Sequence, residues 1–154
     1  NLIGFGFTAE RPSGVYLNTA RARAQGVEAE ASIDLLRGLR LAGIYSYVDA
    51  EDRTSGLDLA RRPNHFGTIC ADWQSAFGLG LGADLRIVGP SWDNGANTNR
   101  LAGYELFDLR ASFGIGDNLE LFGRVENVFD TDYQTVAGYG TAGRSVFGGI
   151  RAKM

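Results

Sequence analysis

Apolar and polar residues alternate with a period of two along most of this chain, and no other feature restricts the fold as strongly. Between residues 27 and 35, every odd position is apolar and every even position is polar. The pattern recurs in 79–87, 107–115 and 146–154, and more weakly in 39–50, 65–75 and 119–129. Because side chains of a β-strand point alternately to its two faces, each segment predicts a strand with one apolar face. Together with residues 2–8, they predict an all-β fold of roughly eight strands.

Short turns and long connections alternate between these predicted strands. Each short turn ends in Gly or Asn, and the three lie at residues 36–38, 76–78 and 116–118. Gly and Asn tolerate the left-handed backbone of a tight hairpin turn, and such turns would place Asp34 opposite Arg40 and Trp73 opposite Leu81. The longer connections span residues 51–62, 91–103 and 130–143. Short turns at one end and long loops at the other are typical of an antiparallel up-and-down outer-membrane barrel.

The alternation alone fits either a membrane barrel, with its apolar face in lipid, or a soluble barrel with that face inside. Three features favour the membrane. Five alternating apolar positions span about the ~25 Å apolar band of such barrels, and the apolar faces mix Leu with Ala and Gly. Aromatic residues of the apolar parity also lie near strand ends, as in the girdles of membrane barrels: Tyr45, Tyr47 and Phe129 at one end, Trp73 and Phe113 at the other. We therefore predict transmembrane β-strands.

Composition excludes several classes of protein. The formal net charge is −3 and the pI is near 5.1, which argues against a nucleic-acid partner. The chain has one Cys and one His, so it forms no internal disulfide and has few ways to build a His-based catalytic pair. No Gly-x-Ser-x-Gly motif and no convincing spacing of acid, base and nucleophile is found. We expect no enzyme activity, no catalytic residues and no bound cofactor.

Two of the long connections carry candidate binding residues. An aromatic ring beside amide and guanidinium groups suits a polar ligand, and such groups occur at Trp92, Asn94, Asn97, Asn99 and Arg100. Carboxylates can hold Ca²⁺ through hard oxygen ligands, and four cluster at another loop: Asp49, Glu51, Asp52 and Asp58. They lack the full EF-hand pattern. The alternatives are a hydrated loop in the first case and a solvated charge cluster in the second.

Several short motifs occur in an order that matches a known family. They are Gly26 and Glu28 at the start of a strand, Arg62 and Pro63 before another, Asn127, Phe129, Asp130 and Tyr133 in an Asn-Val-Phe-Asp-x-x-Tyr stretch, and Gly143 and Arg144 before the last strand. In this order the chain resembles the C-terminal part of the TonB-dependent outer-membrane receptors, of the cobalamin and siderophore type. The resemblance covers nearly all of the chain, and the Asn-Val-Phe-Asp-x-x-Tyr stretch is its most specific element.

The resemblance implies both a fold and a function. Residues 1–154 would be the C-terminal portion of a 22-stranded transmembrane barrel, with the N-terminal plug domain absent. The receptor would take up a metal chelate such as a ferric siderophore, or cobalamin, through the outer membrane of a Gram-negative bacterium. Its partners would be outer-membrane lipid, the missing plug and strands of the same parent chain, and TonB, which would act through the absent N-terminal region. The short turns would face the periplasm, and the long loops and the 10–14 turn would face outside.

Two other functions stay open from the sequence. One is a self-standing eight-stranded outer-membrane barrel that serves as an anchor or adhesin. The other is a soluble ligand-binding β-barrel, which would enclose Leu81, Leu85, Leu109 and Ile150 in a common centre. For the receptor portion, we expect an open sheet in preference to a closed barrel of eight strands.

Overall fold

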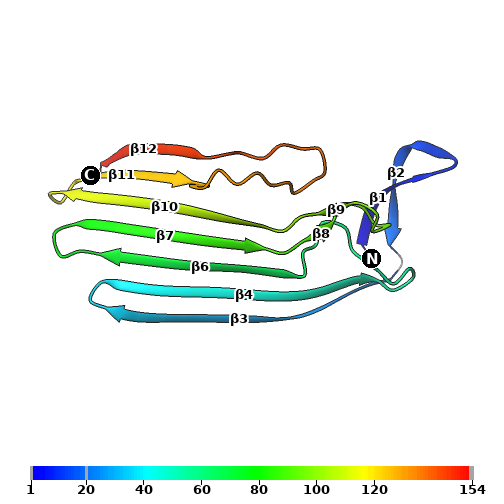
Figure 1. Cartoon of the computed structure of the whole chain (residues 1–154), viewed down its shortest axis with the longest axis horizontal. Coiled ribbons are helices and arrows are strands. Elements are labelled where there is room, and N and C mark those ends of the chain that lie inside the picture. Colours follow the sequence, from blue (N-terminus) through cyan, green and yellow to red (C-terminus); the bar gives the residue numbers. More distant parts are fainter. Residues whose placement is uncertain (1, 20, 153–154) are drawn as a thin grey trace.

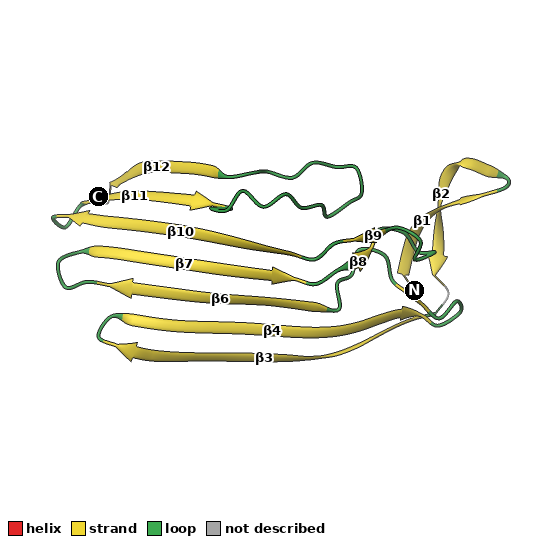
Figure 2. Ribbon diagram, viewed as in Figure 1, coloured by secondary structure: helices red, strands yellow, loops and turns green. Residues whose placement is uncertain are grey.

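The computed structural model describes residues 2–19 and 21–152, with side chains described for 8–16 and 21–152. Every regular element in these residues is a β-strand (Figure 2). The strands are β1 (Leu2–Thr8), β2 (Arg11–Thr19), β3 (Ala22–Leu36), β4 (Leu39–Asp52), β5 (Leu57–Asp58), β6 (His65–Gln74), β7 (Leu79–Val88), β8 (Ser91–Trp92), β9 (Arg100–Leu101), β10 (Tyr104–Ile115), β11 (Leu119–Glu126) and β12 (Ser145–Ala152). In this described part of the chain, no helix is long and apolar enough to cross a membrane.

One antiparallel sheet forms the body of the molecule. Its strands follow the order β12-β11-β10-β7-β6-β4-β3, with β5 paired to the end of β4. Figure 1 shows this sheet as a single layer, with the tight turns at one end and the long connections at the other. The small β8–β9 sheet lies among the long connections. The predicted up-and-down arrangement is therefore confirmed.

The register of the hairpins agrees with the sequence. Asp34 lies opposite Arg40, and Trp73 lies opposite Leu81. The turn between β3 and β4 contains Gly38 with a φ of 77°, a left-handed conformation that Gly adopts without strain. A Cβ atom at Gly38 would also lie 2.1 Å from the Gln74 carbonyl oxygen, so this turn packs directly against the neighbouring hairpin.

The β1–β2 hairpin differs from the prediction. It forms a separate two-stranded sheet, which Figure 1 places beyond the end that carries the long connections. The turn was expected at residues 10–14, but Thr8 already pairs with Arg11, so the turn lies at residues 9–10. Strand β2 was not predicted, and it contains Pro12 and Gly14, which are both unfavourable inside a strand. This turn lies at the same end as the long connections, opposite the tight turns, as the prediction requires; whether that end faces outside stays a prediction.

Other strand ends also differ from the sequence pattern. Strand β3 begins five residues earlier than the alternation suggested, and β11 ends at Glu126 where the pattern continued to residue 129. The last strand, expected over 146–154, begins at Ser145 and is described to Ala152; residues 153–154 lie outside the described residues.

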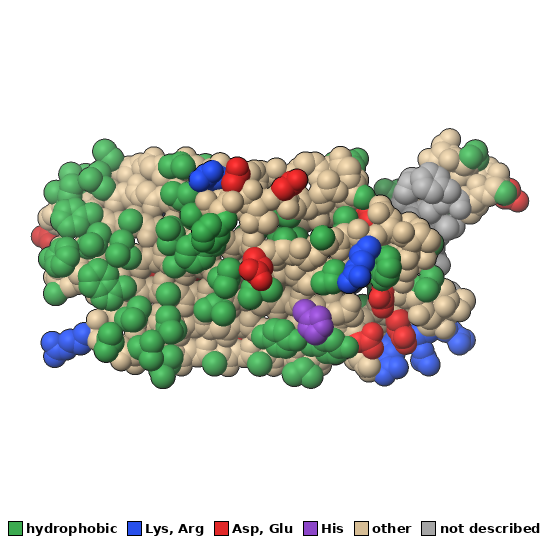
Figure 3. Space-filling view, in the orientation of Figure 1, with side chains coloured by type: hydrophobic (Ala, Val, Ile, Leu, Met, Phe, Trp, Pro, Cys, Tyr) green, Lys and Arg blue, Asp and Glu red, His purple; other side chains and the backbone are tan. Residues whose placement is uncertain are grey.

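The apolar face of the sheet is exposed. The buried apolar residues among those described are Ala50, Leu101 and Leu106, each at most 6% exposed. In contrast, Leu109 is 41% exposed and Ile150 is 71% exposed. Figure 3 shows hydrophobic side chains gathered on one face, most densely toward the tight turns, and a cluster of charged side chains at the long-loop end. A soluble barrel would enclose the apolar face in a common centre, and no such enclosure forms in the described residues.

The sheet remains open. Strands β3 and β12 lie at opposite ends of the strand order, and in the described residues they do not pair with each other. The expected open sheet is therefore confirmed, and the closed eight-stranded arrangement is not formed.

Candidate functional site

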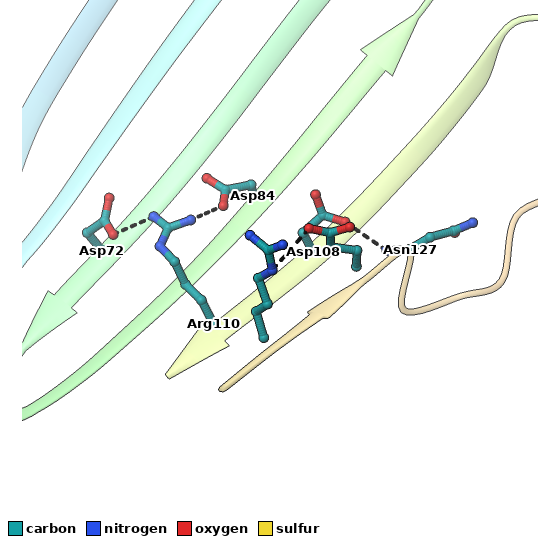
Figure 4. Close-up of polar contacts among 7 residues, drawn as sticks. Asp72, Asp84, Asp108, Arg110 and Asn127 are labelled. Atoms are coloured by element: carbon teal, nitrogen blue, oxygen red, sulfur yellow. Dashed lines mark hydrogen bonds and ion pairs between the residues drawn. The ribbon is translucent and has the colours of Figure 1, made fainter. Parts of the chain in front are cut away.

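An ion-pair network crosses the polar face of the sheet near its middle. The Arg110 guanidinium on β10 pairs with Asp84 on β7 and with Asp72 on β6. Figure 4 shows the three side chains converging from three neighbouring strands. Because the guanidinium contacts two carboxylates, it links strands that are not adjacent to each other.

Gly82 makes room for this network. It lies opposite Arg110 on one side and opposite Asp72 on the other, so the three residues form one row across the sheet. A Cβ atom at Gly82 would lie 2.3 Å from Arg110 Nε. The missing side chain therefore lets the Arg110 side chain lie across β7 and reach β6.

Two further arginines on the same face pair with both a carboxylate and an aromatic ring. Arg124 Nε lies 3.2 Å from Glu126, and its guanidinium lies 4.5 Å from the centre of the Phe147 ring. Arg151 pairs with Glu120 and lies 5.4 Å from the centre of the Phe122 ring. Cations over aromatic faces are stabilised by the ring quadrupole. These pairs compensate much of the charge on a face that is otherwise strongly polar.

The predicted family motif at the end of β11 forms a buried turn. Asn127 is 4% exposed and has a φ of 51°. Its side chain donates to the Thr131 carbonyl (3.0 Å) and accepts from the Thr131 N–H (2.9 Å). Its backbone N–H donates to Asp108 on the polar face (2.7 Å; Figure 4). Asn127 therefore fixes the point at which the chain leaves β11.

The rest of this motif ties the following loop to the last strand. Asp130 Oδ1 accepts a hydrogen bond of 2.7 Å from the Arg144 N–H. A Cβ atom at Gly143 would lie 2.7 Å from that same oxygen, so Gly permits the close approach. Phe129 stacks on Phe107 with ring centres 5.5 Å apart. The structure thus brings four motif residues together where the two ends of this loop meet: Asn127, Asp130, Gly143 and Arg144.

Tyr133, the last member of the motif, packs against the start of β10. Its ring centre lies 4.4 Å from that of Tyr104. This contact holds the middle of the loop near the polar face. The role visible for the motif is structural, since Asn127 and Asp130 bond to the protein itself and both aromatic members pack on rings of β10.

Gly26 and the residue that follows Pro63 both lie beside Val48 on β4. Gly26 lies opposite Val48, and a Cβ atom at Gly26 would lie 2.1 Å from the Tyr47 carbonyl oxygen. Asn64, next to Pro63, accepts from the Val48 N–H through its carbonyl (2.8 Å). Arg62 is exposed. Glu28 is also exposed and lies farther along β3, on the polar face opposite Ser46.

The predicted ligand contacts divide into two groups. Trp92, Asn94 and Asn97 are half-buried and use their polar groups within the protein. Trp92 Nε1 donates to Asp58 (3.2 Å), and Asn94 bonds to Thr98. Asn99 and Arg100 have exposed side chains. Of the five candidates, the last two are thus the better placed to meet a ligand.

Asp93 was not among the predicted site residues, although it occupies a central position. Its carboxylate accepts hydrogen bonds from Arg61 Nε (2.9 Å) and from the Ala137 N–H (3.2 Å). Burial alone would raise the pKa of Asp93, but the hydrogen bonds from Arg61 and Ala137 and the charge of Arg61 lower it below its usual value. The one available signal was that Asp93 is the only carboxylate in residues 91–103.

The predicted calcium residues do not converge. Each carboxylate has a protein partner: Asp49 accepts from Gln25, Glu51 pairs with Arg23, Asp52 accepts from the Thr54 N–H, and Asp58 accepts from Trp92. Across the described ranges, no three His, Cys, Asp or Glu residues form a group that could hold a metal ion. Calcium binding at this loop stays a prediction that this arrangement does not favour.

Comparison with known proteins gives a consistent result. Residues 1–128 match the family model described as TonB dependent receptor-like, beta-barrel. The copper transporter OprC shares 20% identity and a TM-score of 0.79, over 99% of this chain and 26% of that protein. The unliganded ferric citrate transporter FecA shares 23% identity and a TM-score of 0.77, over 86% of this chain and 24% of that protein.

A third solved structure extends this comparison. The ferripyoverdine receptor of the outer membrane of Pseudomonas aeruginosa shares 26% identity and a TM-score of 0.70, over 85% of this chain and 19% of that protein. This chain therefore spans between 19% and 26% of the length of the three proteins. The similarity concerns the fold of one part of each.

Proposed function

Since the chain belongs to the TonB-dependent receptor β-barrel family, we propose that it forms part of the barrel wall and outer loops of an outer-membrane receptor for a metal chelate. In this proposal, the apolar face contacts outer-membrane lipid and the polar face lines the barrel interior. The remaining strands, the plug and the TonB-contacting segment belong to the same parent chain. The family is one of transport receptors, and no enzymatic step is assigned to this portion.

The extent of the apolar face is the observation that carries the proposal. On β3, the outward apolar positions run from Val27 to Leu35, and Val27 lies opposite Tyr47. The next outward pair is polar, Gln25 opposite Asp49. Eight residue steps along a strand cover roughly 26 Å, which matches the apolar band of ~25 Å in outer-membrane barrels. The change to polar pairs at Gln25 would mark the outer surface of the membrane.

The polar face suits a barrel interior. Arg110, Arg124 and Arg151 each pair with carboxylates on neighbouring strands or on their own strand. Such pairs are stable beside water or beside a polar plug, whereas in lipid the same side chains would be costly. This difference supports the assignment of the two faces.

The chelate class is proposed from the related receptors. They are described as proteins for copper, ferric citrate and ferripyoverdine. A metal ion or its complex is common to all three. We therefore place a ferric siderophore or another metal chelate first among substrates for the parent receptor, and cobalamin second.

An uptake experiment tests this function. Cells carrying or lacking the full-length gene would receive radiolabelled iron as its citrate, hydroxamate or catecholate complex, and separately copper or labelled cobalamin. We expect uptake of one compound to require both the gene and TonB. If deletion of the gene leaves the uptake of every compound unchanged, the proposal is contradicted and an anchor or adhesin is favoured.

A labelling experiment tests the orientation separately. An epitope inserted after Gly95, in a long connection, should be accessible to antibody on intact cells. The same epitope after Phe77, in a tight turn, should become accessible only after the outer membrane is permeabilised. The reverse pattern would contradict the assigned orientation.

A further inference from the structure

The three long connections at one end of the sheet are joined to one another by side-chain hydrogen bonds. We call them the first loop (residues 53–64), the second loop (residues 89–103) and the third loop (residues 127–144). The first loop joins β4 to β6, the second joins β7 to β10 and the third joins β11 to β12, so the second loop lies between the other two in the strand order. A residue of the second loop can therefore bond to both of the others.

Asn97 makes a reciprocal link between the second loop and the first. Its Oδ1 atom accepts from the Asp58 N–H (2.9 Å), and its Nδ2 atom donates to the Asp58 carbonyl (3.0 Å). Trp92 Nε1 adds a bond to the Asp58 carboxylate. The Asn97 amide thus bonds both the backbone N–H and the carbonyl of Asp58, as a paired strand would do at that position.

Asp93 extends the linkage to the third loop. One carboxylate oxygen accepts from Arg61 Nε on the first loop and from the Ala137 N–H on the third. The Arg61 N–H also donates to the Trp92 carbonyl (2.6 Å). The Asp93 side chain is 16% exposed, and hydrogen bonds to a shielded charged group are stronger than those between neutral groups.

Backbone conformation supports the same geometry. Arg61 and Asn97 have φ values of 57° and 53°. Such left-handed conformations are unfavourable for residues other than Gly unless the surroundings hold them. Both residues carry the side chains that make the cross-loop bonds.

We infer that Asp93 and Asn97 fasten the three loops into one body, so that the outer surface of this part of the receptor is formed before any ligand arrives. This inference concerns loop rigidity and does not depend on which compound is taken up. The outward position of the loops alone rests on the proposed function.

A preformed surface has a consequence for binding. A ligand that meets ordered loops does not need to immobilise them, so less of the contact energy is lost to ordering. Arg100 and Tyr139, both exposed, would then be presented at fixed positions. Loop closure over the ligand at this side would involve all three loops together.

Amide hydrogen exchange of the full-length protein in detergent micelles tests the inference. In Asp93→Ala, we expect exchange in the first and third loops to rise about tenfold or more, since both lose a bond to the carboxylate. In Asn97→Gly, which tolerates the left-handed backbone, exchange at Asp58 should rise similarly. Exchange in β6, β7 and β10 should stay unchanged and would report that the barrel is folded.

Asp132→Ala is the matched control. Asp132 is exposed on the third loop and, within the described residues, no cross-loop hydrogen bond is found for it. Its substitution should leave the first and second loops unchanged. Faster exchange confined to the second loop in both Asp93→Ala and Asn97→Gly would overturn the inference. If Asp93→Ala does not insert, Arg61→Gly removes the same ion pair and should loosen the first and second loops together.

Discussion

At the residue scale, Asn127 shows how one side chain can stabilise a change of chain direction. Its left-handed backbone would be unfavourable by itself, but its amide bonds both the N–H and the carbonyl of Thr131. The sequence identified this residue through a family motif. It did not identify Asp93, whose partners lie 32 and 44 residues away, because no local pattern specifies contacts between separate loops.

Replacement of Asn127 separates these two contributions. Asn127→Gly loses two hydrogen bonds but keeps a backbone that tolerates positive φ, so it should lower the free energy of unfolding by about 1–3 kcal/mol. Asn127→Ala loses the same hydrogen bonds and also keeps a Cβ atom in the left-handed conformation, so it should lower the free energy of unfolding by about 1–2 kcal/mol more than Asn127→Gly. Urea unfolding in lipid vesicles measures both, and equal losses for the two variants would argue against backbone strain at this site.

At the scale of elements, the period of two predicted the strands of the main sheet because one face of each strand is apolar and the other polar. The prediction failed where that contrast ends. Strand β3 extends beyond Val27 through polar outward residues such as Arg23 and Gln25, so its outer part shows no alternation. Strand β2 contains Pro12 and Gly14, and its existence depends on pairing with β1.

The tight turns offer a matched pair of substitutions. Gly38 and Gly116 both have positive φ, 77° and 58°, so Ala should introduce similar backbone strain in each. At Gly38 the added methyl group would also lie 2.1 Å from Gln74, whereas at Gly116 no atom lies within 4 Å. We expect Gly38→Ala to destabilise the protein by about 1–3 kcal/mol more than Gly116→Ala. Urea titration measures the difference, and similar losses would show that the β3–β4 and β6–β7 hairpins separate easily at this turn.

At the scale of the whole molecule, the sheet is stabilised by strand pairing and by its surroundings, with little internal core. Ala50, Leu101 and Leu106 are buried, while most large apolar side chains face outward. From the alternation alone, two arrangements could be predicted: a membrane barrel with its apolar face in lipid, or a soluble barrel with that face in its core. Both give the same sequence pattern. The family assignment favours lipid outside, and the proposed function adopts that arrangement.

Two neighbouring positions halfway along β10 test the assignment of faces. Leu109→Arg places a charge on the proposed lipid face and should cost roughly 2–4 kcal/mol of folding free energy in the bilayer. Arg110→Leu removes the exposed ion pairs with Asp72 and Asp84, and we expect a loss of about 1 kcal/mol. Folding titrations of the full-length protein into lipid vesicles measure both changes. Equal effects, or a larger effect at Arg110, would contradict the assignment.

The free border of β3 has a practical consequence. Fifteen residues form this strand, and along one side, in the part of the chain described here, no other strand of the main sheet pairs with it. Unpaired backbone donors and acceptors along such a border recruit any extended chain that approaches, including a second copy. Preparations of this segment in isolation should therefore self-associate in a concentration-dependent manner, and capping that border with an added complementary strand should keep the molecules apart.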